Sequence, residues 1–181
     1  MRKTIVPIVC TLAMAIAPAS ALATTGGQRL TPQTKLAAVD VSWVQSSIQA
    51  DMAVVAAADL AEQRTQNVAA LKLASVLLSQ HSKLLAKAEN CAQHLGITIP
   101  TSPSAAQQAM LASLQKLTGR SFAAAFAADE VQGHEAFIAL TQQEIATGVN
   151  VTARASARFW LPIEQHRLAI AETAVKDIPA T

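Results

Sequence analysis

The clearest evidence for the fold class lies in residues 67–96, whose sequence is NVAALKLASVLLSQHSKLLAKAENCAQHLG. Its apolar residues recur every three or four positions, which is the spacing of one face of an α-helix. Asn67 is a suitable N-cap and Gly96 a suitable C-terminal stop, so the pattern predicts a long helix between them. The apolar face consists of Leu71, Ala74, Leu77, Leu78, His81, Leu84, Leu85, Ala88, Cys91 and Leu95.

The same periodicity predicts four further helices along the chain. We expect long helices at residues 37–64, 121–146 and 151–176, and a short amphipathic helix at residues 104–117. Gly119 should end the short helix, and Asn150 should cap the last one. Pro162 lies inside that last helix and predicts a kink or a local break there.

The four long helices have similar lengths, which correspond to about 40 Å each at about 1.5 Å per residue. Tight turns join the first helix to the second and the third to the fourth, whereas the middle connection is long enough to run the length of a bundle. The chain is therefore expected to be all-α, a ferritin-like antiparallel four-helix bundle at residues 37–177 with a short extra helix in the long crossover. Simple up-down connectivity is the alternative.

The first 23 residues have the features of a secretory signal peptide. A positive start and an uncharged stretch at residues 5–17 precede Ala21-Leu22-Ala23, the small-x-small pattern that signal peptidase cleaves. The apolar stretch is too short to span a bilayer core of about 30 Å. We expect cleavage after Ala23, with Ala21 as the second choice, and a flexible leader at residues 24–36. The mature protein is expected in the periplasm or outside the cell.

Removal of Arg2 and Lys3 with the signal leaves a formally neutral mature chain, with 12 basic and 12 acidic residues. Such a chain has no basic surface for nucleic acid, and we expect no nucleic-acid partner. Its only thiol is Cys91, which excludes an internal disulfide. We expect no transmembrane segment in the mature chain. Composition leaves the oligomeric state open.

Histidines and carboxylates near the helix midpoints are the candidate site. His81 and His134 are close to the midpoints of the second and third long helices, and Asp51 is near that of the first. His166 lies about one turn past the middle of the fourth helix, at a level similar to that of Glu130. Imidazoles and carboxylates inside a helical bundle are typical metal ligands, so these five residues predict a site for a transition metal such as Zn, Cu or Fe.

The alternative interpretation is a buried polar layer that bonds only to itself and fixes the helix register. A di-iron ferritin site requires Glu-x-x-His on two helices, and the sequence contains no Glu-x-x-His. Nucleophile triads, phosphate-binding loops and paired-cysteine zinc motifs are also absent. Arg154, Arg158 and Arg167 are interpreted as a solvated face.

Several short motifs resemble an exported bacterial family known as domain of unknown function 4142, which is itself expected to be ferritin-like. The resemblance covers about residues 39–175. Its motifs are Leu60-Ala61, Ala74, Gln80-His81, Leu95-Gly96-Ile97 with Pro100, residues 114–122, residues 131–134, and residues 159–166 with Leu161-Pro162. The resemblance implies export and the fold, and it carries no activity.

The chain departs from this family at three positions. Gln80 and Val54 stand where the resemblance leads us to expect acidic residues, and Ala123 stands where an aspartate is common. Because these changes remove potential ligands, the leading hypothesis is a non-enzymatic envelope protein with a structural, stress-related or interaction role and an unknown envelope partner. The alternative is a metal-binding protein that uses the core histidines. A hydrolase or transferase is a distant third.

Overall fold

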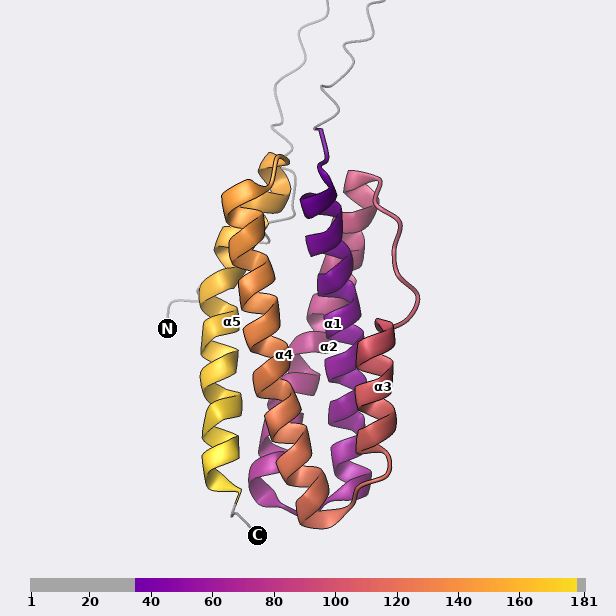
Figure 1. The fold of residues 1–181 in the computed structure, drawn as a ribbon, viewed down its shortest axis with the longest axis vertical. Helices are drawn as coiled ribbons and strands as arrows, with labels where there is room; N and C mark the ends of the chain where they lie inside the picture. Colours follow the sequence, from indigo (N-terminus) through magenta and orange to yellow (C-terminus); the bar gives the residue numbers. More distant parts are fainter. Residues whose placement is uncertain (1–34, 179–181) are drawn as a thin grey trace, which may run out of the picture.

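The computed structural model describes residues 35–178, and this part of the chain consists of five α-helices and no β-strand. Helices α1 (Ala38–Arg64) and α2 (Val68–Leu95) form one antiparallel hairpin, and α4 (Gly119–Thr147) and α5 (Val151–Asp177) form the other (Figure 1). The short helix α3 (Ala105–Leu114) lies in the connection between the hairpins. The predicted all-α bundle with a short extra helix in the crossover is confirmed.

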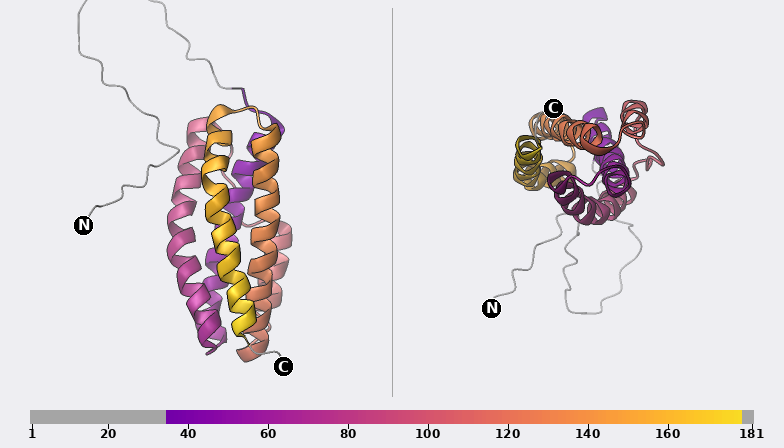
Figure 2. Two further views of the ribbon diagram at one scale, coloured as in Figure 1. Left: turned by 90° about the vertical axis from the view of Figure 1, so that its left-hand side faces the viewer. Right: turned by 90° about the horizontal axis from the view of Figure 1, so that it is seen from below.

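The long crossover sets how the two hairpins face each other. From the end of α2 the chain returns along α1, and α3 packs outside the four long helices, against α1 and α4 (Figures 1 and 2). The hairpins meet mainly along α1 and α4, while α2 and α4 run in the same direction on opposite corners. This is the predicted crossover connectivity and not the up-down alternative. That the bundle is ferritin-like stays a prediction.

The helix ends follow the capping residues in the sequence. The Asn67 side chain accepts a hydrogen bond from the backbone N–H of Ala70 at 3.0 Å, and Asn150 caps α5 in the same way. Gly96 adopts the left-handed conformation with φ of 66° at the end of α2, where a residue with a Cβ is disfavoured. The predicted starts of α2 and α5 are confirmed.

One local prediction was wrong, and at a second position one of two predicted alternatives is excluded. The short helix ends at Leu114, and Gly119 is the first residue of α4 instead of the stop of the preceding helix. At Pro162 we expected a kink or a local break; helix α5 is continuous across this residue, which excludes the break. Pro162 and Arg158, whose carbonyl loses its helical partner to the proline, are both exposed, so water can satisfy that carbonyl.

The apolar core is divided into two clusters at different heights of the bundle. One cluster surrounds Phe122, Phe126, Leu73 and Leu77, and many of its other members are alanines, which let the helices approach closely. The other cluster contains Trp43, Val44 and Ile48 near the opposite end. Buried polar side chains lie between the two clusters in the sequence of every long helix. They are Asp51, His81, Glu130, His134, Glu164 and Arg167, and we call these six residues the polar layer.

The predicted signal peptide (1–23) and most of the predicted leader (24–36) lie outside the described residues, so the structure does not bear on them. Among residues 35–178, no helix combines the length and the apolar character needed to cross a bilayer.

Candidate functional site

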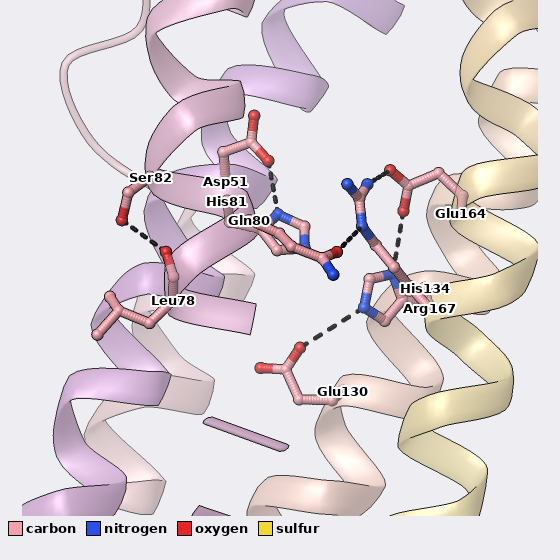
Figure 3. A network of polar contacts seen from close by, with 9 residues as sticks. All are labelled: Asp51, Leu78, Gln80, His81, Ser82, Glu130, His134, Glu164 and Arg167. Carbon is pink, nitrogen blue, oxygen red and sulfur yellow. Dashed lines mark hydrogen bonds and ion pairs between the residues drawn. The ribbon is translucent and has the colours of Figure 1, made fainter. Parts of the chain in front are cut away.

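The polar layer is assembled from all four long helices at one height of the bundle (Figure 3). Asp51 comes from α1, His81 from α2, Glu130 and His134 from α4, and Glu164 and Arg167 from α5. Each of these residues is at most 5% exposed. Ionisable groups are rarely buried to this extent unless they are paired, so the contacts within the layer decide its chemistry.

His81 and Asp51 form the first pair, within the α1–α2 hairpin. The Nδ1 atom of His81 lies 2.7 Å from Oδ1 of Asp51, and when Asp51 is ionised Nδ1 carries the proton and donates to the carboxylate. Burial raises the pKa of Asp51, and the contact with His81 partly opposes that effect. The bond fixes the ring so that its second nitrogen, Nε2, is left available.

His134 and Glu164 form the equivalent pair within the α4–α5 hairpin. The Nδ1 atom of His134 lies 3.1 Å from Oε2 of Glu164, and Arg167 binds the other oxygen of this carboxylate. Burial alone would raise the pKa of Glu164, but the contacts with His134 and Arg167 outweigh it and hold the pKa below its usual value. Glu164 is therefore ionised at neutral pH, and His134 donates from Nδ1.

Arg167 connects the two hairpins through a side chain outside the layer. Its Nε donates to Oε1 of Gln80 in α2 at 2.8 Å while its Nη1 binds Glu164 (Figure 3). This hydrogen bond crosses from α5 to α2, two helices that otherwise contact each other sparingly.

Glu130 lies one turn before His134 and, unlike Asp51 and Glu164, has no hydrogen bond to another residue of the layer. Its Oε2 is 3.9 Å from Nε2 of His134, which is beyond hydrogen-bond distance. Burial, together with the nearby charge of Asp129, raises the pKa of Glu130 to about 8. The side chain is thus mainly a neutral carboxylic acid at pH 7.

The two imidazole rings face each other across the bundle. Their centroids are 5.7 Å apart and their planes are tilted by 48°. Within the described residues, Nε2 of His81 and Nε2 of His134 are both buried and have no hydrogen-bond partner. In a neutral imidazole with its proton on Nδ1, the Nε2 atom presents a lone pair. Leaving such an atom buried and unpaired costs about 1–3 kcal/mol, so both Nε2 atoms are available to a further binding partner.

The prediction for two positions on α5 was wrong. His166 is exposed and lies in a separate groove between α2 and α5, away from the layer. Arg167, which we interpreted as solvated, is buried in the layer, and Glu164 was missed. The heptad spacing of α5 could have placed both Glu164 and Arg167 on the inward face. The inward positions of α5 alternate steps of three and four residues and comprise Ala153, Ala157, Trp160, Glu164, Arg167, Ala171 and Ala174. His166 falls outside this series.

The comparisons with known proteins identify a family and no individual relative. The sequence matches the family described as Domain of unknown function (DUF4142) over residues 25–174, which is most of the chain and includes the whole polar layer. The chain belongs to the DUF4142 family. No curated protein and no solved structure matches it.

The three departures noted in comparison with DUF4142 have distinct surroundings. Gln80 accepts the hydrogen bond from Arg167, which an acidic residue would also accept. Val54 lines a cavity that adjoins the polar layer, so an acidic side chain there would enter the site. Ala123 is fully buried in the apolar cluster around Phe122 and Phe126, away from the layer.

A second buried polar group lies at the end of the bundle where α1 begins and α4 turns into α5. Oδ1 of Asp40 accepts hydrogen bonds from the backbone N–H groups of Val149 and Asn150, both at 2.9 Å. Burial disfavours the Asp40 carboxylate, but these and other hydrogen bonds hold its pKa below the usual value. Burial and the neighbouring Asp40 raise the pKa of Glu144 to about 7. This group ties helix ends together, which is a structural role.

Proposed function

We propose that this member of DUF4142 is an exported, non-enzymatic protein that binds one transition-metal ion between His81 and His134. The observation that carries the proposal is the pair of buried Nε2 atoms without hydrogen-bond partners, which present lone pairs when the imidazoles are neutral. Each Nδ1 is held by a carboxylate, which is the arrangement that orients metal-binding histidines and raises their basicity.

The separation of the rings fits a shared ion. Two imidazoles that bind one metal through Nε2, at about 2.0–2.1 Å each, place their ring centroids about 5–6 Å apart. The observed separation of 5.7 Å lies in this range. Two imidazole nitrogens and one carboxylate suit Zn, Cu or Fe, and such an ion would supply a Lewis-acid or redox centre.

Glu130 is the third ligand in this proposal. Among residues 35–178, no three His, Cys, Asp or Glu side chains are already arranged to hold a metal ion. Ligand atoms that share one ion lie about 3.3 Å apart. Oε2 of Glu130 is 3.9 Å from Nε2 of His134, so a small side-chain rotation brings it into range.

The charge of the layer also suits a divalent cation. With both imidazoles neutral and Glu130 ionised, the carboxylates of Asp51, Glu130 and Glu164 face the single guanidinium of Arg167. The layer then carries two net negative charges, which a divalent ion neutralises. Binding should release a proton, because Glu130 is mainly protonated without the ion.

Elemental analysis tests the proposal, using protein purified from its native envelope without chelators or an affinity tag. We expect about one equivalent of Zn, Cu or Fe per chain, retained through dialysis and lost in His81→Ala and His134→Ala. His94→Ala and His166→Ala are matched controls, because both side chains are exposed and should not affect retention.

Folded protein that contains no metal and takes up none on titration would contradict the metal proposal. The polar layer would then serve only to fix helix register, and the structural, stress-related or interaction role would become the leading hypothesis.

Export is tested separately by N-terminal sequencing of protein from the periplasmic fraction and the medium. We expect the mature chain to begin at Thr24 after cleavage behind Ala23. A cytoplasmic protein that retains Met1 would contradict the export proposal without bearing on the metal site.

A further inference from the structure

A cavity of about 150 Å³ adjoins the polar layer on the side of Trp43. Its polar end is formed by His81, His134 and Glu130, and residues of all five helices contribute to its walls. The two imidazoles that carry the proposed function thus stand at one end of a space that extends beyond them.

The walls of the cavity contain most of the aromatic residues of the protein. The chain has only four Phe, two Trp and no Tyr, and four of these six side chains line this cavity: Trp43, Phe137, Phe159 and Trp160. Trp43 stacks on Phe137 with centroids 6.5 Å apart, and Phe159 meets Trp160 edge to face at 4.9 Å. Aromatic walls of this kind favour a flat, apolar ligand.

The volume of the cavity limits the ligand to about one ring. Apolar cavities of about 150 Å³ bind benzene. Lys87, which lies 5.8 Å above the Trp160 ring, and the exposed Gly133 also line the cavity, so solvent-accessible positions border it. A single six-membered aromatic ring therefore matches both the size and the walls.

The polar end selects the head group of the ligand. When His81 and His134 are neutral and donate from Nδ1 to carboxylates, their buried Nε2 atoms accept hydrogen bonds. The carboxylates of Asp51 and Glu164 close by disfavour an anionic head group. The complementary group is a neutral hydrogen-bond donor such as a hydroxyl.

We propose that this cavity binds a small phenol-type molecule, with its ring between Trp43, Phe137 and Trp160 and its hydroxyl donating to Nε2 of His134 or His81. The inference shares the two Nε2 atoms with the proposed function, but it needs no metal. It is therefore tested on chelator-treated, metal-free protein.

Tryptophan fluorescence is the direct readout, because the only two tryptophans, Trp43 and Trp160, both line the cavity. Phenol should change the emission saturably, with a midpoint at or below about 1 mM, which is within the range for a ligand of seven non-hydrogen atoms. Calorimetry should give the same midpoint. Toluene lacks the donor and should bind at least about tenfold more weakly, and benzoate should not bind.

Substitutions test separately how the cavity walls and the hydrogen bond to the ligand's head group contribute to binding. Ala88→Leu fills the cavity and should abolish phenol binding, whereas the matched control Ala69→Leu, in the other groove of the same helix, should leave it unchanged. The double variant His81→Leu/His134→Leu removes both acceptors and should abolish the preference for phenol over toluene. Toluene binding in this variant shows that the cavity remains intact.

Three results would overturn the inference: no saturable response to phenol, equal binding of phenol and toluene by the unmodified protein, or unchanged binding by Ala88→Leu. Metal titration of Ala88→Leu keeps the two proposals apart, because this variant retains all the proposed metal ligands. In the unmodified protein, metal uptake without phenol binding contradicts only this inference, and phenol binding without metal uptake contradicts only the metal proposal.

Discussion

Arg167 of α5 pairs with Glu164 inside the bundle, and its guanidinium also donates to Gln80 of α2 at 2.8 Å. The side chain is 4% exposed, so it is the buried cation that balances the carboxylates around it. Its position makes the stability of the protein depend on a charge at the level of the two histidines.

Arg167→Met should destabilise the protein by about 3–5 kcal/mol, because it leaves the Glu164 carboxylate buried without its cation. The free energy of unfolding in urea measures the effect. Arg158→Met, on the exposed face of the same helix, should change stability by less than about 0.5 kcal/mol.

A double-mutant cycle tests the pairing of Arg167 with Glu164. Glu164→Gln keeps an acceptor for His134 and removes the charge, so the double variant Glu164→Gln/Arg167→Met should lose less stability than the sum of the single changes. Strict additivity of the two substitutions would show that Arg167 stabilises the bundle by packing alone.

Asp51→Ala should affect stability and metal retention together. It leaves Nδ1 of His81 buried without an acceptor, at a cost of about 1–3 kcal/mol. It should also weaken metal binding by about 10- to 100-fold, because the ring is no longer held in place. Chelator competition and urea unfolding measure the two effects. Asp59→Ala, at an exposed position of the same helix, is the control, and an Asp51→Ala protein with unchanged metal affinity would argue against a supporting role for Asp51.

Two glycine-to-alanine substitutions should change the stability of the protein in opposite directions. A Cβ at Gly148 would clash with Oε1 of Glu144 and lie 2.6 Å from the Glu144 carbonyl oxygen, so Gly148→Ala should cost about 1–3 kcal/mol. A Cβ at Gly133 meets nothing within 4 Å, and Gly133→Ala inside α4 should stabilise the protein by about 0.5–1 kcal/mol. Thermal unfolding of both variants checks the pair, and a stabilised Gly148→Ala would contradict the close packing at Glu144.

The stability of the protein should fall as the pH rises through about 7, in part because of Glu144. The pKa of this group is raised from 4.5 to about 7, so the folded protein binds the proton more tightly than the unfolded chain. The stabilisation is present below about pH 4.5 and is lost as the pH rises through about 7. Glu130 acts in the same direction near pH 8.

The contribution of Glu144 is isolated by Glu144→Gln. The melting temperatures of this variant and of the unmodified protein, measured from pH 5 to pH 9, should diverge in favour of the variant above pH 7. Glu172→Gln on the exposed face of α5 should follow the unmodified protein. Parallel curves for Glu144→Gln and the unmodified protein would show that Glu144 does not titrate in this range.

The arrangement of the helices was predictable because capping residues and apolar spacing agree. Asn67, Gly96 and Asn150 mark helix ends in the sequence and do so in the structure. Equal helix lengths also placed Asp51, His81 and His134 at one level, and their contacts confirm that placement.

The α5 contribution to the site was not predictable by the same reasoning. His166 and Arg167 are adjacent, so a rotation of about 100° decides which of them faces inward. The charge of Arg167 favoured an exposed side chain. The buried alanines at heptad spacing along α5, however, place Arg167 on the inward face of the helix. The ion pair with Glu164 on the same helix compensates for the burial of Arg167. This pair can be recognised in the sequence only once it is known which face of α5 points inward.

Both histidine–carboxylate bonds close within a hairpin, and in both the two residues are 30 positions apart in the sequence. Each hairpin thus carries a complete half-site, and each bond can form before the hairpins dock. The approach of the two imidazoles is different, because it joins α2 to α4 across the crossover. Whatever binds both Nε2 atoms therefore recognises the docked pair of hairpins, and its binding energy strengthens their association over either hairpin alone.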